Sequence, residues 1–347
     1  MFSISDILKK YKEPRAKSAP AVEKKVEVPF QPTFPVKEKD EPSVARSQEK
    51  EIVTDETVEK LYYDAVLCAK KLYLPSAVYT QEIFAEIETI VSRISACFRN
   101  GNEELIRLCV SEYPSAQHFL PYHAVNVCML SVFLGSVLGS PPQFLLELGV
   151  ASFLHDIGLN EYFDIITQGT ILSADEQGKI QEHPQKGYDI LQRVYPGASH
   201  AILTAVYQEH ERLDGSGYPR GLKKDEINEY AAIIAPVDVY EAMIHQRPYR
   251  SKYTPVEAIF NNKKAFDHKV LKALIERVGI FPVGTLVRLN TKEVAVVTRI
   301  NPNSPLRPHV DIVLDAHGKK LAQIKQIDLN EDSVIYIEEC MKDISIT

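Results

Sequence analysis

Residues 144–158, FLLELGVASFLHDIG, organise the rest of the sequence, because an almost wholly apolar segment ends there in the adjacent pair His155-Asp156. A histidine and a carboxylate at the end of a hydrophobic helix are costly to bury, and a bound metal ion is the usual compensation. We therefore expect a buried metal site at His155-Asp156, with further ligands supplied by other parts of the chain.

The composition is that of a soluble globular protein with two or three domains: 347 residues, 45% hydrophobic and 25% charged. The net charge of -7 argues against polymeric nucleic acid as a partner, although a local basic pocket for a phosphate ligand is compatible with it. The five cysteines form no CxxC motif, which predicts neither disulfides nor a thiolate metal site and indicates the cytoplasm. Residues 1–10 lack the long hydrophobic core of a secretory signal.

One stretch has the hydropathy of a membrane span, since residues 113–146 contain no Asp, Glu, Lys or Arg. Pro121 interrupts it, and so does the run Gly135, Gly139, Pro141-Pro142. These breaks leave two shorter segments, so we expect two buried core helices and no membrane contact.

The residue pattern divides the chain into four parts. Residues 1–55 mix charged residues with prolines and are predicted to be a disordered arm. Residues 56–112 carry two helical apolar stripes that must pack against the next domain or a second copy of the chain, which leaves a homodimer open. Residues 113–280 are predicted to be an all-α domain. Residues 281–347 are predicted to be a small antiparallel β module, and this module and the arm are the candidate sites for protein partners.

Local signals set the expected elements within these parts. Ser173 and Glu176 form a capping box that predicts a helix to about residue 195, and residues 254–257 form a second box. Another helix is expected from about residue 201 to 213. Runs of β-branched residues predict strands at 285–289, 294–300, 310–314 and 334–337.

Several polar side chains fall on helix faces that should point inward. Glu209 and His210 continue the apolar stripe of Ile202 and Val206, and Asp238 lies on an apolar face of the next helix. A single histidine on such a face is usually a hydrogen-bonded core residue, and that is what we expect of the histidines at 118, 200, 245, 268, 309 and 317. The prediction of a metal site rests instead on a combination within one helical block: His123, His155, Asp156, His183, Glu209, His210 and Asp238.

This ligand set exceeds the needs of one four-coordinate zinc. It suits two metals that share a bridging carboxylate, at the ~3.5 to 4 Å separation of two-metal phosphoryl-transfer sites. Mixed imidazole and carboxylate ligands favour two divalent ions of iron or manganese.

The order His123, His155-Asp156, Asp238 resembles that of the HD superfamily of metal-dependent phosphohydrolases. The run 209–219, EHERLDGSGYP, is similar to the signature of the HD-GYP branch, and His183-Pro184 and residues 247–250 (RPYR) occur in the matching order. The resemblance covers about residues 113–280. The β tail from 281 is similar to an extension found after this domain in some members, and residues 1–112 show no such likeness.

The resemblance implies an HD-type helical bundle that hydrolyses cyclic di-GMP to the linear dinucleotide or to GMP, with a hydroxide held by two metals. His123, His155, Asp156 and Asp238 would bind one metal, and Asp156 would bridge to a second, bound by His183, Glu209 and His210. Asp156 is therefore also the catalytic residue of this hypothesis. Residues matching the family's substrate contacts are Arg247 and Arg250 for the phosphates and Gly217, Tyr218 and Pro219 for the pocket rim.

The sequence departs from the family pattern at four positions. Glu209 replaces a histidine, and Leu159 replaces a lysine that lies near the scissile phosphate. Glu241 replaces an aspartate, and Phe119 replaces a glutamate of three-metal members, which favours two metals. Removing one transition-state electrostatic group commonly costs ~3 to 4 kcal/mol, so the enzyme is expected to be slow.

Two alternatives stay open, the first of them motivated by Leu159, Glu209 and the long arm. One is a weakened domain that binds cyclic di-GMP or a partner protein and acts as a signalling module. The other is a hydrolase for another nucleotide, such as a nucleoside triphosphate or an alarmone, and Gly217-Tyr218-Pro219 with Arg247 and Arg250 counts against it.

Overall fold

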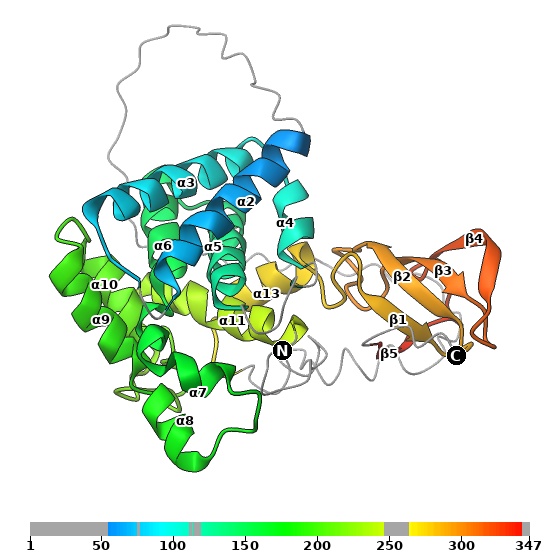
Figure 1. The fold of residues 1–347 in the computed structure, drawn as a ribbon. Coiled ribbons are helices and arrows are strands. Elements are labelled where there is room, and N and C mark those ends of the chain that lie inside the picture. Colours follow the sequence, from blue (N-terminus) through cyan, green and yellow to red (C-terminus); the bar gives the residue numbers. More distant parts are fainter. Residues whose placement is uncertain (1–54, 75–76, 111–112, 114–118, 246–263, 342–347) are drawn as a thin grey trace, which may run out of the picture. The chain divides into compact units, whose positions relative to one another are not determined.

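The computed structural model describes residues 55–74, 77–110, 113, 119–245 and 264–341. The expected arm, the capping box at 254–257 and the arginines at 247 and 250 lie outside these residues. Within them the predicted fold class is confirmed: helices make up the first part and a small antiparallel sheet follows (Figure 1).

The helices are short to medium in length and follow one another through brief connections. Their bounds, including two 3-10 helices marked η, are α2 Asp55–Leu72, α3 Gln81–Arg99, α4 Glu104–Cys109, α5 Phe119–Val137, α6 Pro142–Leu154, η2 Ile157–Tyr162, α7 Phe163–Thr167, α8 Ala174–Ile180, α9 His183–Val194, α10 His200–Gln208, η3 Lys224–Glu226, α11 Glu229–Ile244 and α13 His268–Arg277.

Helices α5 and α6 form the centre of the helical part, and α2, α3, α10 and α11 pack around them (Figure 1). Neither helix has a distinct polar face, and neighbouring helices bury most of α5 and the second half of α6, as expected of core helices. Among the described residues, α5 is the one helix long and apolar enough to cross a membrane, and 83% of its most apolar window is buried inside the protein. That burial is typical of a core helix.

Two helix predictions are wrong in extent. The helix expected from Ser173 to about residue 195 does begin with the capping box, but it ends at Ile180, and α9 starts afresh at His183. Pro184 explains the break, since proline has no backbone N–H and fits only the first turn of a helix. The helix expected over 201–213 ends at Gln208, so Glu209 and His210 lie at its C-terminal end.

The sheet contains five antiparallel strands in the order β4-β3-β2-β1-β5. Alternate residues of β3, for example Val310 and Ile312, point into a small core that is separate from the helical one. The strand bounds are β1 Leu286–Leu289, β2 Val294–Arg299, β3 His309–Leu314, β4 Lys320–Asp328 and β5 Ile337–Cys340.

The last two strands differ from the prediction. Strand β4 was not predicted: it is an edge strand with weak alternation, in which the large apolar side chain of Ile324 is 64% exposed. The strand expected at 334–337 lies later, as β5, because the side chain of Asp332 accepts hydrogen bonds from the backbone N–H groups of Val334 and Ile335. That contact turns the backbone before it can join the sheet.

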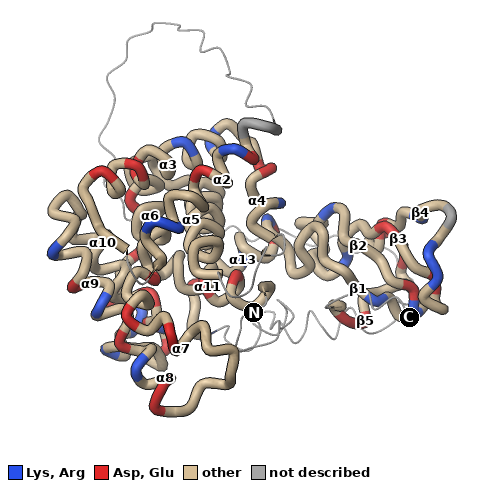
Figure 2. Tube along the Cα trace, viewed as in Figure 1, with Lys and Arg blue, Asp and Glu red and all other residues tan. Residues whose placement is uncertain are grey.

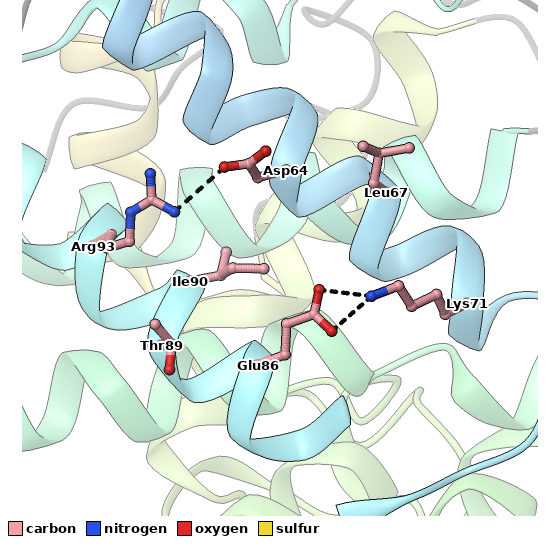
Figure 3. Close-up of a pocket in the computed structure, with 7 residues that line it drawn as sticks. All are labelled: Asp64, Leu67, Lys71, Glu86, Thr89, Ile90 and Arg93. Atoms are coloured by element: carbon pink, nitrogen blue, oxygen red, sulfur yellow. Dashed lines mark hydrogen bonds and ion pairs between the residues drawn. The ribbon is translucent and has the colours of Figure 1, made fainter. Parts of the chain in front are cut away.

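Charged residues lie mainly on the outer helices, whereas α5 carries none (Figure 2). Between α2 and α3, the ion pairs Lys71–Glu86 (2.8 Å) and Arg93–Asp64 (3.5 Å) border a shallow pocket (Figure 3). Such exposed pairs add little stability. None of the predicted metal ligands lines this pocket, so the candidate site lies elsewhere.

Candidate metal centre

The structure brings the seven predicted ligands together into one cluster of two groups. Ligand atoms of Asp156, His183, Glu209 and His210 all lie within 4.8 Å of one another, and so do those of His123, His155 and Asp238. Residues from α5, α6, η2, α9, α10 and α11 therefore meet at one place, although the earliest and the latest are more than a hundred positions apart in the sequence.

Most of these side chains lie where a helix begins or ends. His155 follows the last residue of α6, Asp156 precedes η2, and His183 is the first residue of α9. Glu209 follows α10, so it and His210 can both face the cluster where the chain leaves the helix. His123 and Asp238 are the exceptions, inside α5 and α11.

Three histidines are held in the same tautomer. Nδ1 of His155 lies 2.7 Å from the carbonyl oxygen of Ser152, and Nδ1 of His183 lies 2.7 Å from that of Ile180. A carbonyl oxygen only accepts hydrogen bonds, so each Nδ1 carries the proton. His123 presents Nδ1 to the carboxylate of Glu241 at 2.5 Å. Each unprotonated Nε2 then points into the cluster, as in histidines that bind metals.

Asp156 lies between the two groups and offers one oxygen to each. Its Oδ2 is 3.3 Å from Nε2 of His123 and 3.4 Å from Nε2 of His155. Its Oδ1 is 3.4 Å from Nε2 of His183. This placement is what a bridging carboxylate requires, and Asp238 completes the first group with Oδ1 3.2 Å from Nε2 of His123.

The cluster contains polar atoms that the described residues do not satisfy. Both carboxylate oxygens of Glu209 and the Nε2 of His155 are buried without a hydrogen-bond partner among the described residues. The nearest imidazole nitrogens to Glu209, on His183 and His155, lie 3.4 and 3.7 Å away. Unpaired buried donors and acceptors are strongly unfavourable. A divalent cation fits this donor set, because oxygen and imidazole ligands converge on it.

The pKa values of His183, His210 and Asp156 agree with groups arranged around a cation. Burial and the neighbouring His183 lower the pKa of His210 to about 3, and burial also lowers that of His183, so both imidazoles are neutral at pH 7. Burial alone would raise the pKa of Asp156. The surrounding histidines, His155 first, outweigh burial and hold the pKa of Asp156 well below its usual range. Neutral imidazoles and ionised carboxylates are the forms that bind metals.

Gly158 lets the loop after Asp156 approach the start of α9. A Cβ at this position would lie 2.1 Å from the carbonyl oxygen of His183 and 2.7 Å from the backbone nitrogen of Gly187. Any side chain would therefore push η2 away from α9. The contact between Asp156 and His183 depends on this glycine.

The segment after Glu209 is a rigid loop. Gly217 packs against the backbone of the same loop, since a Cβ there would lie 2.4 Å from both the nitrogen of Arg212 and the carbonyl oxygen of His210. The carboxylate of Glu211 accepts hydrogen bonds from the backbone N–H groups of Arg220 (2.7 Å) and Leu222 (2.8 Å). These bonds hold the loop beside the ligand His210.

The predicted substrate contacts are placed only in part. The ring of Tyr218 stacks on that of His210, with centroids 4.7 Å apart, and Pro219 beside it is exposed. Tyr218 and Gly217 thus lie next to the metal ligands, as expected of a pocket rim. Arg247 and Arg250 lie outside the described residues, so their role stays a prediction.

Several residues that surround the ligands were not predicted from the sequence. His245 is a buried, hydrogen-bonded histidine, as expected, but its place beside the ligands was not predicted: it stacks on the ring of Tyr113, and its Nδ1 lies 3.0 Å from the carboxylate of Glu241. Asn126 also reaches Glu241, at 2.8 Å. The sequence did offer one signal for Asn126, since a polar residue one turn after His123 in an otherwise uncharged helix is expected to be buried near that histidine.

Comparison with known proteins agrees with this geometry. The sequence model of the HD domain matches residues 110–269, and that of a KOW domain associated with the HD domain matches residues 286–347. A cyclic di-GMP phosphodiesterase of Pseudomonas aeruginosa is 32% identical over 284 residues, covering 78% of this chain and 67% of the relative.

Two further relatives and one solved structure extend the comparison. The cyclic di-GMP phosphodiesterase PdeB of Borreliella burgdorferi is 29% identical over 61% of this chain and 55% of its own length. That of Thermotoga maritima is 31% identical over 58% of this chain and 51% of its own length. A structure described as an HD-GYP-type protein, from Bdellovibrio bacteriovorus, superposes with a TM-score of 0.53 at 16% identity, over 66% of this chain and 73% of that one, and supports the fold. The chain belongs to the HD domain family, in its HD-GYP branch.

Proposed function

We propose that this protein is a metal-dependent phosphodiesterase that hydrolyses cyclic di-GMP. The observation that carries the proposal is the buried cluster itself, in which seven nitrogen and oxygen ligands converge and both oxygens of Glu209 have no hydrogen-bond partner among the described residues. Relatives that align with most of this chain are cyclic di-GMP phosphodiesterases, which supports the substrate.

The chain's residues would share the work of holding two divalent ions. His123, His155 and Asp238 would hold the first, and His183, Glu209 and His210 the second, with Asp156 reaching both. The chemistry that such ions supply is polarisation of a phosphate oxygen and a lowered pKa of water. The absence of thiolates and the mixture of carboxylate and imidazole favour iron or manganese.

The remaining residues would bind and orient the substrate. Tyr218, fixed on the ring of His210, and Gly217 would shape the rim of the pocket, with Pro219 beside them. Arg247 and Arg250 would contact the phosphates, since guanidinium groups bind phosphate through paired hydrogen bonds. Protein partners of the arm or of the β module, a homodimer and a cytoplasmic location all stay predictions.

The substrate class is a cyclic dinucleotide, and its identity needs a direct comparison. Relatives from Vibrio cholerae that align with 43% and 46% of this chain are 3'3'-cGAMP-specific phosphodiesterases. Turnover of cyclic di-GMP and of 3'3'-cGAMP by the same preparation therefore decides between them, and chromatography of the products distinguishes the linear dinucleotide from GMP.

A second candidate function is binding without turnover, and Leu159 favours it. This apolar side chain is 6% exposed, three residues after Asp156, where the resemblance places a lysine. A domain lacking that cation could retain the dinucleotide and signal to a partner protein.

One experiment separates the two functions. The purified protein is loaded with Mn²⁺ or with Fe²⁺ under anaerobic conditions, its metal content is measured, and cyclic di-GMP is added. We expect two metals per chain and a linear product. Binding by calorimetry with no product for either metal would favour the signalling module, and a protein without bound metal and without product would contradict the proposal.

A further inference from the structure

Glu241 is a buried carboxylate at the centre of a hydrogen-bond network next to the metal ligands. Its Oε2 accepts a hydrogen bond from Nδ1 of His123 at 2.5 Å. Its Oε1 accepts from the hydroxyl of Tyr113 at 2.5 Å and the amide of Asn126 at 2.8 Å, and Nδ1 of His245 lies 3.0 Å away. The chain thus supplies this anion with donors from three directions.

The network continues to α2, a helix that precedes the residues matched by the HD domain. The hydroxyl of Tyr62 in α2 donates to the amide oxygen of Asn126 at 3.0 Å, and Asn126 donates in turn to Glu241. The order is therefore Tyr62, Asn126, Glu241, His123. Because Asn126 uses its oxygen for Tyr62 and its nitrogen for Glu241, its amide has one orientation that satisfies both neighbours.

The same N-terminal segment contacts the chain on both sides of His155-Asp156. The hydroxyl of Tyr73 donates to the carbonyl oxygen of Phe153 at 2.7 Å, two residues before His155. The amide of Asn160 in η2 donates to the carbonyl oxygen of Leu72 and to the hydroxyl of Tyr79, at 2.5 and 2.7 Å. The end of α2 and the loop after it therefore contact the chain just before and just after His155-Asp156.

We infer that Glu241 is a positioning residue for His123, and that α2 takes part in the metal centre through Tyr62 and Asn126. This inference rests on the proposed function, because it assigns a role toward the metals. Glu241 fixes the proton of His123 on Nδ1 and leaves Nε2 unprotonated toward Asp156 and Asp238. Carboxylates that hold a ligand histidine in this way raise its basicity and fix its ring orientation.

The first test replaces Glu241 with glutamine, which keeps the size of the side chain but removes its charge. Metal affinity is measured by titrating Mn²⁺ against a competing chelator. We expect one of the two sites to weaken by about 10- to 100-fold, as for other groups that hydrogen-bond ligand histidines. Glu241→Asp keeps the charge on a shorter side chain and is expected to retain more affinity than Glu241→Gln.

The second test addresses α2 with a matched pair of substitutions. Tyr62→Phe removes the hydroxyl that orients Asn126. Tyr195→Phe removes the hydroxyl of a tyrosine with a similarly small exposed fraction, which donates to Glu88 outside this network. We expect Tyr62→Phe to lower Mn²⁺ affinity by about threefold or more and to shift the visible spectrum of the Co²⁺-loaded protein. Tyr195→Phe is expected to change neither, although both variants lose a similar amount of thermal stability in EDTA.

The outcomes separate this inference from the proposed function. If the unsubstituted protein binds no metal and forms no product, the proposed function fails. If it binds two metals and turns over but Glu241→Gln binds them equally well, the positioning role alone is overturned. If Tyr62→Phe and Tyr195→Phe have the same affinity and spectrum, the part assigned to α2 is overturned, even where Glu241→Gln does not fold.

Discussion

Two glutamates at the metal centre, the predicted ligand Glu209 and its neighbour Glu241, are both completely buried, yet their surroundings are opposite. Glu241 accepts hydrogen bonds from Tyr113, Asn126 and His123. Neither oxygen of Glu209 has a hydrogen-bond partner among the described residues. The protein therefore holds one carboxylate with its own donors and leaves the other facing the remaining ligands.

Their pKa values move in opposite directions for this reason. Burial raises the pKa of Glu209 well above its usual range, and attraction to His155 offsets only part of that effect. Burial acts on Glu241 too, but His245, His123 and their hydrogen bonds outweigh it and hold its pKa well below its usual range. Glu241 is thus stable as an anion within the chain, whereas Glu209 needs a cation that the described side chains do not supply.

The largest expected effect comes from breaking both halves of the cluster at once. Asp156→Ala removes the carboxylate that faces both ligand groups, so we expect both metals to be lost and phosphodiesterase activity to fall by about a thousandfold or more. Elemental analysis and product formation measure the two effects, and circular dichroism checks that the helices remain. A variant that still bound two metals would contradict the bridging role.

A smaller effect should distinguish the unsatisfied carboxylate from a satisfied one. Glu209→Gln removes an unpaired buried charge, so with EDTA present we expect the free energy of unfolding to rise by about 1 to 3 kcal/mol. The matched control is Glu211→Gln, two residues away and also buried, whose carboxylate accepts two backbone hydrogen bonds. We expect that variant to lose about 1 to 3 kcal/mol.

The stabilisation by Glu209→Gln should also depend on pH. Because the folded-state pKa of Glu209 is raised, its charge destabilises the metal-free protein at pH values above that pKa. The advantage of the variant should be largest there. It should disappear as the pH falls through the raised pKa to below the ordinary value of about 4.3, where the carboxyl is protonated in both states. Denaturant unfolding across this range measures it, and a gain independent of pH would count against an unpaired charge at Glu209.

Much of the site could be predicted from sequence because several ligands are polar residues within an apolar helical pattern. His123 and Asp238 show this most clearly, within helices that are otherwise buried. Glu209 and His210 were found through an assumed helix that in fact ends at Gln208. Their shared direction comes from the chain leaving that helix, which periodicity does not describe.

The surroundings of the ligands could not be predicted in the same way. The stacked rings of His245 and Tyr113 are more than a hundred positions apart in the sequence, and Tyr62 contacts Asn126 from another helix. No local sequence pattern relates the members of either pair. The exposed edge strand β4 was missed for a different reason, since none of its described side chains is buried and the alternation is weak. Contacts between distant elements determine both features.

The smallest expected effect concerns a positive charge near the metal ligands. Asp156 and Glu209 form ion pairs only with histidines among the described residues, and Leu159 stands where the family pattern has a lysine. Leu159→Lys should raise kcat for cyclic di-GMP by about tenfold, less than the two to three decades of a preorganised group, because the site is shaped for an apolar side chain. Leu159→Met, similar in size and uncharged, is the control. Equal rates for the two variants would show that the missing positive charge at Leu159 does not limit turnover.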